Sequence, residues 1–289
     1  MNVRTFLGIV GVVGVAGAAG CGGERAPLGE SAPAPEPAAA TSSPHGPSAP
    51  VADPLWSCTA SPVQSSPGSR SAKVGLALVD PGGASPIAGA TVRACGSAVD
   101  AACSEVVGAA ETTTEGRASF DVPTGARGFA GYFETTRAGD LPNVAFVSPP
   151  IAADAPDYAR PYWSRSDLGA FARMASIELE PEQGHVLVST FDCRALGGAQ
   201  AVPAAGVIVE LDPAPPGARA AYTVRDGAGV SLSASARSSD ATGHAALFNV
   251  AAGKYTLVGR LASTGAVVAR APLHVRAGAL STIALVPGL

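Results

Sequence analysis

The chain has 289 residues, of which 19 are Lys or Arg and 23 are Asp or Glu, so its formal net charge is −4 at pH 7. The charges are scattered along the sequence, which argues against a nucleic-acid-binding protein, because such proteins need a concentrated basic face. Aromatic residues make up 5% of the chain. Stacking surfaces for bases or sugars would therefore be sparse.

The N-terminus has the pattern of an export signal. Arg4 precedes an apolar run from Phe6 to Gly20, which is shorter than the roughly 20 residues that a membrane-spanning helix needs. Small residues followed by Cys21 resemble the lipobox of bacterial lipoproteins, in which the signal is cut before the cysteine and the cysteine is acylated. The resemblance implies a signal peptide at 1–20 and a lipid anchor on Cys21. The alternative is an ordinary secretory signal that is cleaved near a cysteine.

The anchor and the segment after it determine where the protein is expected. Two or three acyl chains would hold the protein stably on a membrane. Gly22 follows the cysteine where an aspartate would favour the inner membrane, so we expect the outer membrane. Residues 21–54 are rich in Pro, Ala and Ser and contain few large apolar side chains. Such a segment buries too little surface to fold, so it is predicted to be a disordered tether.

The remainder of the chain contains an internal repeat. Four elements occur twice in the same order: an apolar run, the pattern P-x-A-G-x-x-V, a turn glycine and the pattern F-x-V-x-x-G. They are Lys73–Asp80, Pro86–Val92, Gly116 and Phe120–Gly125 in the first copy, and His185–Asp192, Pro203–Val209, Gly243 and Phe248–Gly253 in the second. The second copy has ten more residues before its turn glycine, which predicts a loop insertion.

Each copy has the pattern of short antiparallel strands. Large apolar side chains alternate with small or polar ones in Ser119–Val122, which is the period of a half-buried strand. Gly116 and Gly243 stand where a hairpin turn needs a positive φ, a conformation that glycine adopts without steric cost. Short strands separated by Gly and Pro turns predict antiparallel β-sandwiches.

These motifs resemble the carboxypeptidase-regulatory-like or transthyretin-like module. Both copies have an alanine, Ala118 and Ala245, where that family usually has an aromatic residue. The resemblance implies an all-β fold with two antiparallel Greek-key (Ig-like or transthyretin-like) sandwiches, at 55–148 and 184–289, separated by a linker at 149–183. The order of elements also resembles two-module lipoproteins of myxobacterial type, which implies an architecture and a cell-envelope location but no reaction.

The linker is predicted to contain one short helix. The Pro-rich stretch at 149–161 favours a surface loop. After it, Ser164 or Ser166 could cap a helix on which Leu168 and Phe171 fall on one face. We expect this helix to pack against the sandwiches or to bridge them.

Four cysteines follow Cys21, namely Cys58, Cys95, Cys103 and Cys193. In an exported chain they favour disulfides, and four cysteines allow three pairings. The short spacing favours Cys95 with Cys103, which leaves Cys58 with Cys193. A zinc site is the competing interpretation, but the C-x-x-C and H-x-x-H spacings typical of one are missing from the sequence. No metal and no cofactor is predicted.

No catalytic site is predicted. The sequence has no G-x-S-x-G turn for a nucleophile, and His185 and His244 stand where surface positions are expected. Glu178, Glu180 and Glu182 alternate, and paired carboxylates can hydrolyse glycosides or bind calcium. The simpler interpretation is the solvated face of a strand.

Aromatic residues provide the remaining candidates for a binding site. Trp56 and Trp163, with Tyr158 and Tyr162, lie outside the clear strands and are predicted ligand contacts, whereas the aromatic residues of 129–133 are expected in the core. Two functions remain open. The first is a non-enzymatic scaffold or adhesin-like protein with envelope proteins as partners. The second is a carbohydrate-binding protein that attaches cell-wall polysaccharide or exopolysaccharide.

Overall fold

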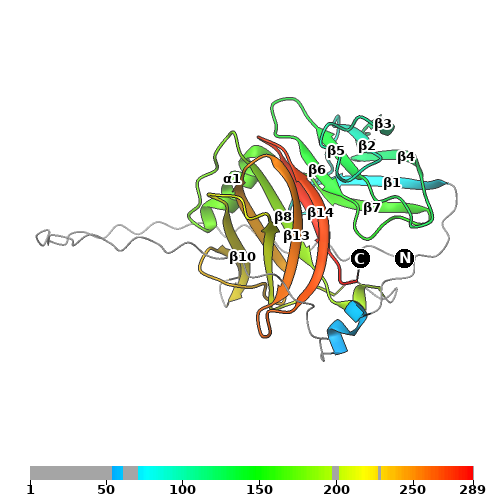
Figure 1. The fold of residues 1–289 in the computed structure, drawn as a ribbon. Helices are drawn as coiled ribbons and strands as arrows, with labels where there is room; N and C mark the ends of the chain where they lie inside the picture. Colours follow the sequence, from blue (N-terminus) through cyan, green and yellow to red (C-terminus); the bar gives the residue numbers. More distant parts are fainter. Residues whose placement is uncertain (1–53, 61–70, 197–201, 227–228, 289) are drawn as a thin grey trace, which may run out of the picture.

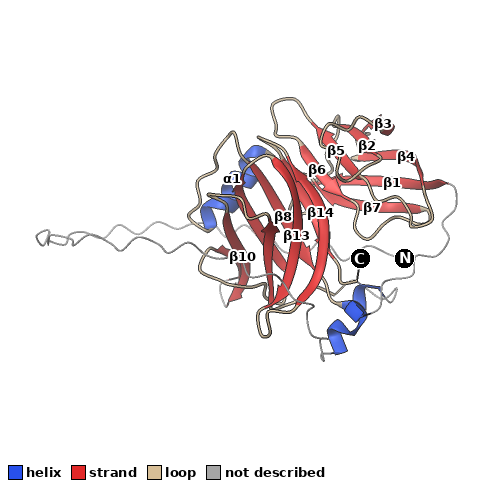
Figure 2. Ribbon diagram, in the orientation of Figure 1, coloured by secondary structure: helices blue, strands red, loops and turns tan. Residues whose placement is uncertain are grey.

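The computed structural model describes residues 54–60, 71–196, 202–226 and 229–288. The predicted signal peptide, Cys21 and the tether up to residue 53 lie outside the described residues. Within these residues the fold is all-β with one α-helix, as predicted, and the strands form two β-sandwiches (Figures 1 and 2). In the part of the chain that the structure describes, no helix has the length and apolar character needed to cross a membrane.

The first sandwich encloses its core between two sheets. Apolar side chains that alternate along each strand, such as Phe120 and Val122, point between the sheets and are buried. One sheet contains β1 (Ser71–Val79), β4 (Arg117–Pro123) and β7 (Ala155–Pro161), and the other contains β2 (Thr91–Cys95), β3 (Val106–Glu111), β5 (Tyr132–Thr136) and β6 (Asn143–Phe146).

The second sandwich repeats the central strand pairings of the first. Its larger sheet contains β8 (Gly184–Thr190), β10 (Arg219–Asp226), β11 (Gly229–Ser233), β12 (His244–Val250) and β15 (Leu280–Leu285), and its smaller sheet contains β9 (Val207–Asp212), β13 (Gly253–Leu261) and β14 (Val267–Val275). Strand β1 pairs antiparallel with β4 and parallel with β7, and β8 pairs in the same way with β12 and β15. The extra residues of the second copy belong to the β10–β11 hairpin, which extends the larger sheet beyond β12.

The two turn glycines confirm the hairpin prediction. Gly116 has a φ of 70° and Gly243 a φ of 68°, and both stand immediately before or at the strand that follows the turn. At both positions a Cβ atom would also come within 3.0 Å of a main-chain atom of a neighbouring strand or loop. The repeated glycine is therefore required twice over, by backbone conformation and by space.

One continuous sheet runs through both sandwiches. Strand β15, the last of the chain, pairs parallel with β8 on one side and with β6 of the first sandwich on the other, in the register Leu280↔Asn143 to Thr282↔Ala145. The result is a nine-stranded sheet in the order β11-β10-β12-β8-β15-β6-β5-β2-β3. Strands of the two sandwiches are thus hydrogen-bonded to each other in the middle of this sheet.

Residues Ala155–Pro161, which the sequence predicts to be part of a linker, form strand β7 instead. This strand pairs with β1 alone and lies at the edge of its sheet. Prolines such as Pro156 and Pro161 are tolerated there because an edge strand has one row of main-chain groups without a neighbour. The carboxylate of Asp154 accepts a hydrogen bond from the main-chain N–H of Lys73 at 2.8 Å, just before the pairing begins.

Helix α1 (Arg165–Met174) covers the outer face of the larger sheet. Ser164 caps it, because the Ser164 hydroxyl accepts a bond from the Asp167 N–H while the Asp167 carboxylate accepts one from the Ser164 N–H. This capping box confirms the first of the two predicted caps. Leu168 is buried against the sheet and Phe171 packs beside it. The molecule therefore has a third apolar layer outside the sandwich cores.

Candidate functional site

Both predicted disulfides are confirmed. Cys95 bonds with Cys103, and Cys58 bonds with Cys193. The second bond ties the short 3₁₀ helix η1 (Pro54–Ala60) to η2 (Cys193–Leu196) at the edge of the second sandwich. It joins residues 135 positions apart, so the whole first sandwich lies inside the covalent loop that it closes.

Trp56 is not available as a ligand contact. Its side chain is 4% exposed and belongs to the core cluster that fills the second sandwich and extends to the junction with the first. The expectation that it is exposed is wrong because η1 lies against η2 and β14 and carries the indole inward. Such a position resembles that of an interior residue more than that of a recognition residue.

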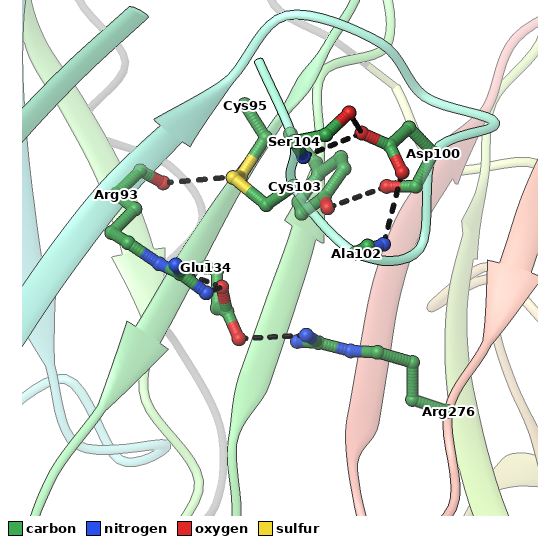
Figure 3. A network of polar contacts seen from close by, with 9 residues as sticks. Arg93, Cys95, Asp100, Ala102, Cys103, Ser104, Glu134 and Arg276 are labelled. Carbon is green, nitrogen blue, oxygen red and sulfur yellow. Dashed lines mark hydrogen bonds and ion pairs between the residues drawn. A yellow bond between two sulfur atoms is a disulfide. The ribbon is translucent and has the colours of Figure 1, made fainter. Parts of the chain in front are cut away.

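Charged residues meet at the junction between the sandwiches. Glu134 of β5, whose side chain is 5% exposed, pairs with Arg93 of β2 and with Arg276, which follows β14 in the second sandwich. Burial disfavours the charged carboxylate, but hydrogen bonds and charge from Arg276 and Arg93 outweigh it and hold the pKa of Glu134 below its ordinary value. Figure 3 shows the carboxylate lying between the two guanidinium groups.

The loop closed by Cys95 and Cys103 docks on the second sandwich at the same junction. His274 of β14 is fully buried, and its Nδ1–H donates to the carbonyl of Ala98 in the loop at 3.0 Å. The hydroxyl of Tyr132 donates to the carbonyl of Asp100 at 2.7 Å. Mainly because of burial, the pKa of His274 lies below its ordinary value, so the ring is neutral at pH 7.

Internal hydrogen bonds give this loop its shape. The carboxylate of Asp100 accepts hydrogen bonds from the main chain of Ala102 at 3.0 Å and from both the main chain and the hydroxyl of Ser104 at 2.6 Å (Figure 3). The bonds from Ser104 lower the pKa of Asp100. Although the sulfurs of Cys95 and Cys103 and a carboxylate oxygen of Glu134 lie within 4.8 Å of one another, disulfide sulfurs are not thiolate ligands.

These junction residues are not among the candidates that the sequence predicts. The available signal was a charge inside an apolar strand pattern, as in Tyr132–Thr136, where Glu134 stands between buried neighbours. A buried charge needs a partner. The partner, Arg276, is 142 positions away and could not be named without the fold.

Trp163 lines a groove on the outer face of the joined sheet, between α1 and β7. We call it the aromatic groove, and it has a volume of about 200 Å³. Trp163 is partly exposed, and its ring lies 5.2 Å from that of Phe171. Polar side chains also face the groove, among them Arg160, Ser189 and His244. An aromatic ring beside hydroxyl, imidazole and guanidinium groups can both stack on and hydrogen-bond a ligand.

Ser189 and His244 form a cross-strand pair in this groove. They are register partners in β8 and β12, and the Ser189 hydroxyl lies 3.2 Å from Nδ1 of His244. Burial lowers the pKa of His244, and the charge of Asp240 opposes this effect. The Asp240 carboxylate accepts hydrogen bonds from Thr242 and Thr223. In the described residues no carboxylate is hydrogen-bonded to this imidazole, so the pair lacks the orienting third group of a catalytic triad.

The other residues that the sequence suggests for a functional site lie apart from one another. Tyr162 is 2% exposed and Tyr158 lies in β7, where Arg160 stacks on its ring at 3.9 Å. Glu178 and Glu180 are exposed, as expected, but they lie in an irregular segment and not in a strand. His185 is 5% exposed, so the expectation of a surface position is wrong for this residue.

Comparisons with known proteins leave the family open. No protein-family model and no curated protein matches the chain. Among solved structures it is similar to a variant of the shaft pilin SpaA from Lactobacillus rhamnosus GG, with 14% identity over 75% of this chain and 98% of that one and a TM-score of 0.25.

Two further solved structures are similar at the same level. The Bacillus anthracis TIE protein has 13% identity and a TM-score of 0.25, over 75% of this chain and 33% of that one. GBS52, the minor pilin of Streptococcus agalactiae, has 15% identity and a TM-score of 0.23, over 75% of this chain and 96% of that one. These values are too low for any property of those proteins to be carried to this chain.

Proposed function

We propose that this chain is a non-enzymatic cell-envelope protein in which two β-sandwiches form one rigid unit with a scaffold or adhesin-like role. The observation that carries the proposal is the nine-stranded sheet that runs through both sandwiches. Domains joined by a linker alone are expected to move relative to each other. Here the β15–β6 pairing, the Glu134–Arg276 ion pair and the contact between His274 and Ala98 all oppose such motion.

Rigidity can be measured in the full-length oxidised chain. Spin labels at Val106 and Met174, two exposed apolar residues on β3 and α1, place one probe on each sandwich. A rigid unit gives one narrow distance distribution by electron–electron double resonance. The variant Glu134→Ala, which removes the ion pair with Arg276, should broaden it. A broad distribution in the otherwise native chain would refute the proposed rigid unit.

The proposed location rests on the N-terminal sequence. Lipidation of Cys21 after removal of residues 1–20 would anchor the protein to a membrane, with the residues from 21 up to the start of η1 at Pro54 as a tether and the outer membrane as the expected site. This location agrees with the resemblance to myxobacterial-type lipoproteins with carboxypeptidase-regulatory-like modules. Cell fractionation of the native chain and of Cys21→Ser tests it. The native chain should sediment with membranes and the variant should not, and a native chain that stays in the soluble fraction would exclude the anchor.

A carbohydrate-binding function is the alternative, and the aromatic groove favours it. Trp163 is partly exposed there, so its fluorescence should change when cell-wall polysaccharide or exopolysaccharide binds. Trp56 provides an internal reference because it is buried in the core. The variant Trp163→Phe should lose the response, and Val106→Ala, which changes an exposed residue on β3, should keep it. If purified polysaccharide leaves the emission of the native chain unchanged, this function is excluded.

A further inference from the structure

A second cavity lies on the other side of α1 from the aromatic groove. It has a volume of about 770 Å³ and lies between the helix and the irregular segment that follows it. This volume is in the range of small-molecule sites, roughly 300–1,000 Å³. Part of its lining is apolar, and this part consists of Leu141, Leu168, Ile177, Leu179 and Pro181. We call it the α1 cavity.

Two exposed arginines line the α1 cavity. Arg165, Gly169 and Arg173 line it at positions i, i+4 and i+8, so they lie on one face of the helix. A Cβ atom at Gly169 would lie 3.4 Å from Nη1 of Arg173, which shows that this guanidinium folds back over Gly169, toward Arg165. Within the described ranges neither arginine has a carboxylate partner. Two like charges without partners favour an anion between them.

His185 adds a neutral donor at the wall of the cavity. Its side chain is 5% exposed, and Nδ1 accepts a hydrogen bond from the main-chain N–H of Asn249 at 3.3 Å. The proton of the neutral ring is therefore on Nε2, which leaves that nitrogen as a donor. Burial and, to a smaller extent, the charge of Arg165 lower the pKa of His185 to about 4, so the ring is neutral at pH 7.

The opposite wall is held in place by Asn249. Its amide Nδ2 donates to the carbonyl of Glu178 at 2.8 Å, and its Oδ1 accepts from the N–H of Glu180 at 3.0 Å. The wall is thus preformed. The side chains of Glu178 and Glu180 are exposed and line the same cavity. Their charges offset those of Arg165 and Arg173 over the cavity as a whole, so an anion is favoured only beside the arginines, and a ligand with several negative charges is disfavoured.

We propose that the α1 cavity binds a ligand with a single carboxylate on an apolar body. The carboxylate would lie between the guanidinium groups of Arg165 and Arg173 and the Nε2–H of His185, with the apolar body against the leucine and isoleucine side chains. Charge-assisted bonds to guanidinium are among the strongest that a carboxylate makes. Two sources have this chemistry, namely the C-terminus of a peptide that ends in an apolar residue and an aliphatic acid. The site is independent of the proposed scaffold function.

Binding to the full-length chain can be measured by ligand-observed saturation-transfer NMR and by calorimetry. The probes are N-acetyl-leucine for a peptide terminus, octanoate for an aliphatic acid, N-acetyl-leucine amide as the uncharged analogue and inorganic phosphate as the polyanion. We expect one or both carboxylates to bind, and the amide and phosphate to bind at least about tenfold more weakly. Binding of N-acetyl-leucine alone identifies a peptide terminus, and binding of octanoate alone identifies an aliphatic acid.

Exposed arginines allow a matched set of variants. Arg165→Gln and Arg173→Gln should each weaken carboxylate binding about tenfold or more, because each removes one charge from the cavity. Arg127→Gln makes the same charge change on an exposed loop of the first sandwich and should leave binding unchanged. Failure of both carboxylates to bind, equal binding of the amide, or equal binding by the two cavity variants and the native chain would each overturn the proposal.

Discussion

Nη1 of Arg276 lies 2.7 Å from Oε1 of Glu134, and this ion pair joins the end of β14 in the second sandwich to β5 in the first. The Glu134 side chain is 5% exposed while that of Arg276 is 23% exposed, so the carboxylate is the deeper partner. It also accepts a bond from Arg93. One buried carboxylate therefore balances two cations, one from each side of the junction.

Glu134→Gln should destabilise the chain because it leaves two cations without a counter-charge. Removing one partner of a buried ion pair typically lowers the free energy of unfolding by about 3–5 kcal/mol, and partial exposure of the arginines places the expected loss near the lower end. Urea denaturation followed by far-UV circular dichroism measures it. Arg117→Gln removes one partner of the exposed Arg117–Asp157 pair and serves as the control, with an expected loss below about 1 kcal/mol. Equal losses in both variants would contradict the structural role of the junction.

The two disulfides should differ in their contributions to stability. Cys95–Cys103 closes a separation of 8 residues and Cys58–Cys193 one of 135. In the chain-entropy model these loops correspond to about 2–3 and about 5 kcal/mol of the free energy of unfolding. The double variants Cys95→Ser/Cys103→Ser and Cys58→Ser/Cys193→Ser test this order in denaturant titrations.

Fluorescence provides a second measurement on the same variants. Loss of Cys58–Cys193 frees η1 from η2, so the buried Trp56 should shift its emission to longer wavelength. Loss of Cys95–Cys103 should shift the Trp56 emission less, because this bond does not hold η1. An equal loss in the free energy of unfolding in the two double variants would contradict the order that the chain-entropy argument predicts.

The internal repeat made most of the sandwich architecture predictable. Alternation in Ser119–Val122 and the turn glycines mark strands by local rules, and the structure confirms them. The joining of the two sandwiches followed no local rule. Pairing of Leu280 with Asn143 connects residues 137 positions apart, and short strand patterns do not specify which edges will meet. Strand β7 was missed because prolines at positions 156 and 161 favour a loop unless the strand lies at an edge.

Candidate contacts could be predicted only where exposure follows from local sequence. Trp163, next to the helix cap, is partly exposed as expected. Trp56 is buried because η1 packs against η2 and β14, and the bond from Cys58 to Cys193, 135 positions away, holds η1 there. The position of His185 at the start of a predicted strand favours an exposed side chain. It is buried because α1 and the segment after it cover that face of the sheet, which is a tertiary effect.

Stability should fall as the pH drops below about 6.5, before carboxylates begin to titrate. His185 has a folded-state pKa of about 4, against 6.5 for the unfolded chain, so the unfolded chain binds more protons between these values. The full contribution is present above pH 6.5 and is lost progressively toward pH 4. At about 1.4 kcal/mol per pKa unit, this loss is about 3 kcal/mol for His185. The lowered pKa of His274 acts in the same direction.

Thermal denaturation at pH values from 7.5 to 4.5 measures this dependence. The variant His185→Asn keeps an acceptor near the position of Nδ1 for the Asn249 N–H but does not titrate. Its midpoint should change less between those pH values than that of the native chain. A parallel pH dependence in the two proteins would show that protonation of His185 is not coupled to folding.

Asn249 should control the shape of the α1 cavity through its backbone as well as its side chain. Its φ is 56°, a left-handed conformation that asparagine tolerates and that is costly for most other side chains. Asn249→Ala loses both hydrogen bonds to the Glu178–Glu180 segment and adds backbone strain, so we expect a loss of about 2–4 kcal/mol in the free energy of unfolding. Asn249→Gly loses the same bonds without the strain and should cost about 1 kcal/mol less. Hydrogen exchange of the Glu180 amide should speed up in both variants, since its acceptor is the Asn249 side chain. Unchanged exchange at Glu180 would mean that this side chain does not hold the wall of the cavity.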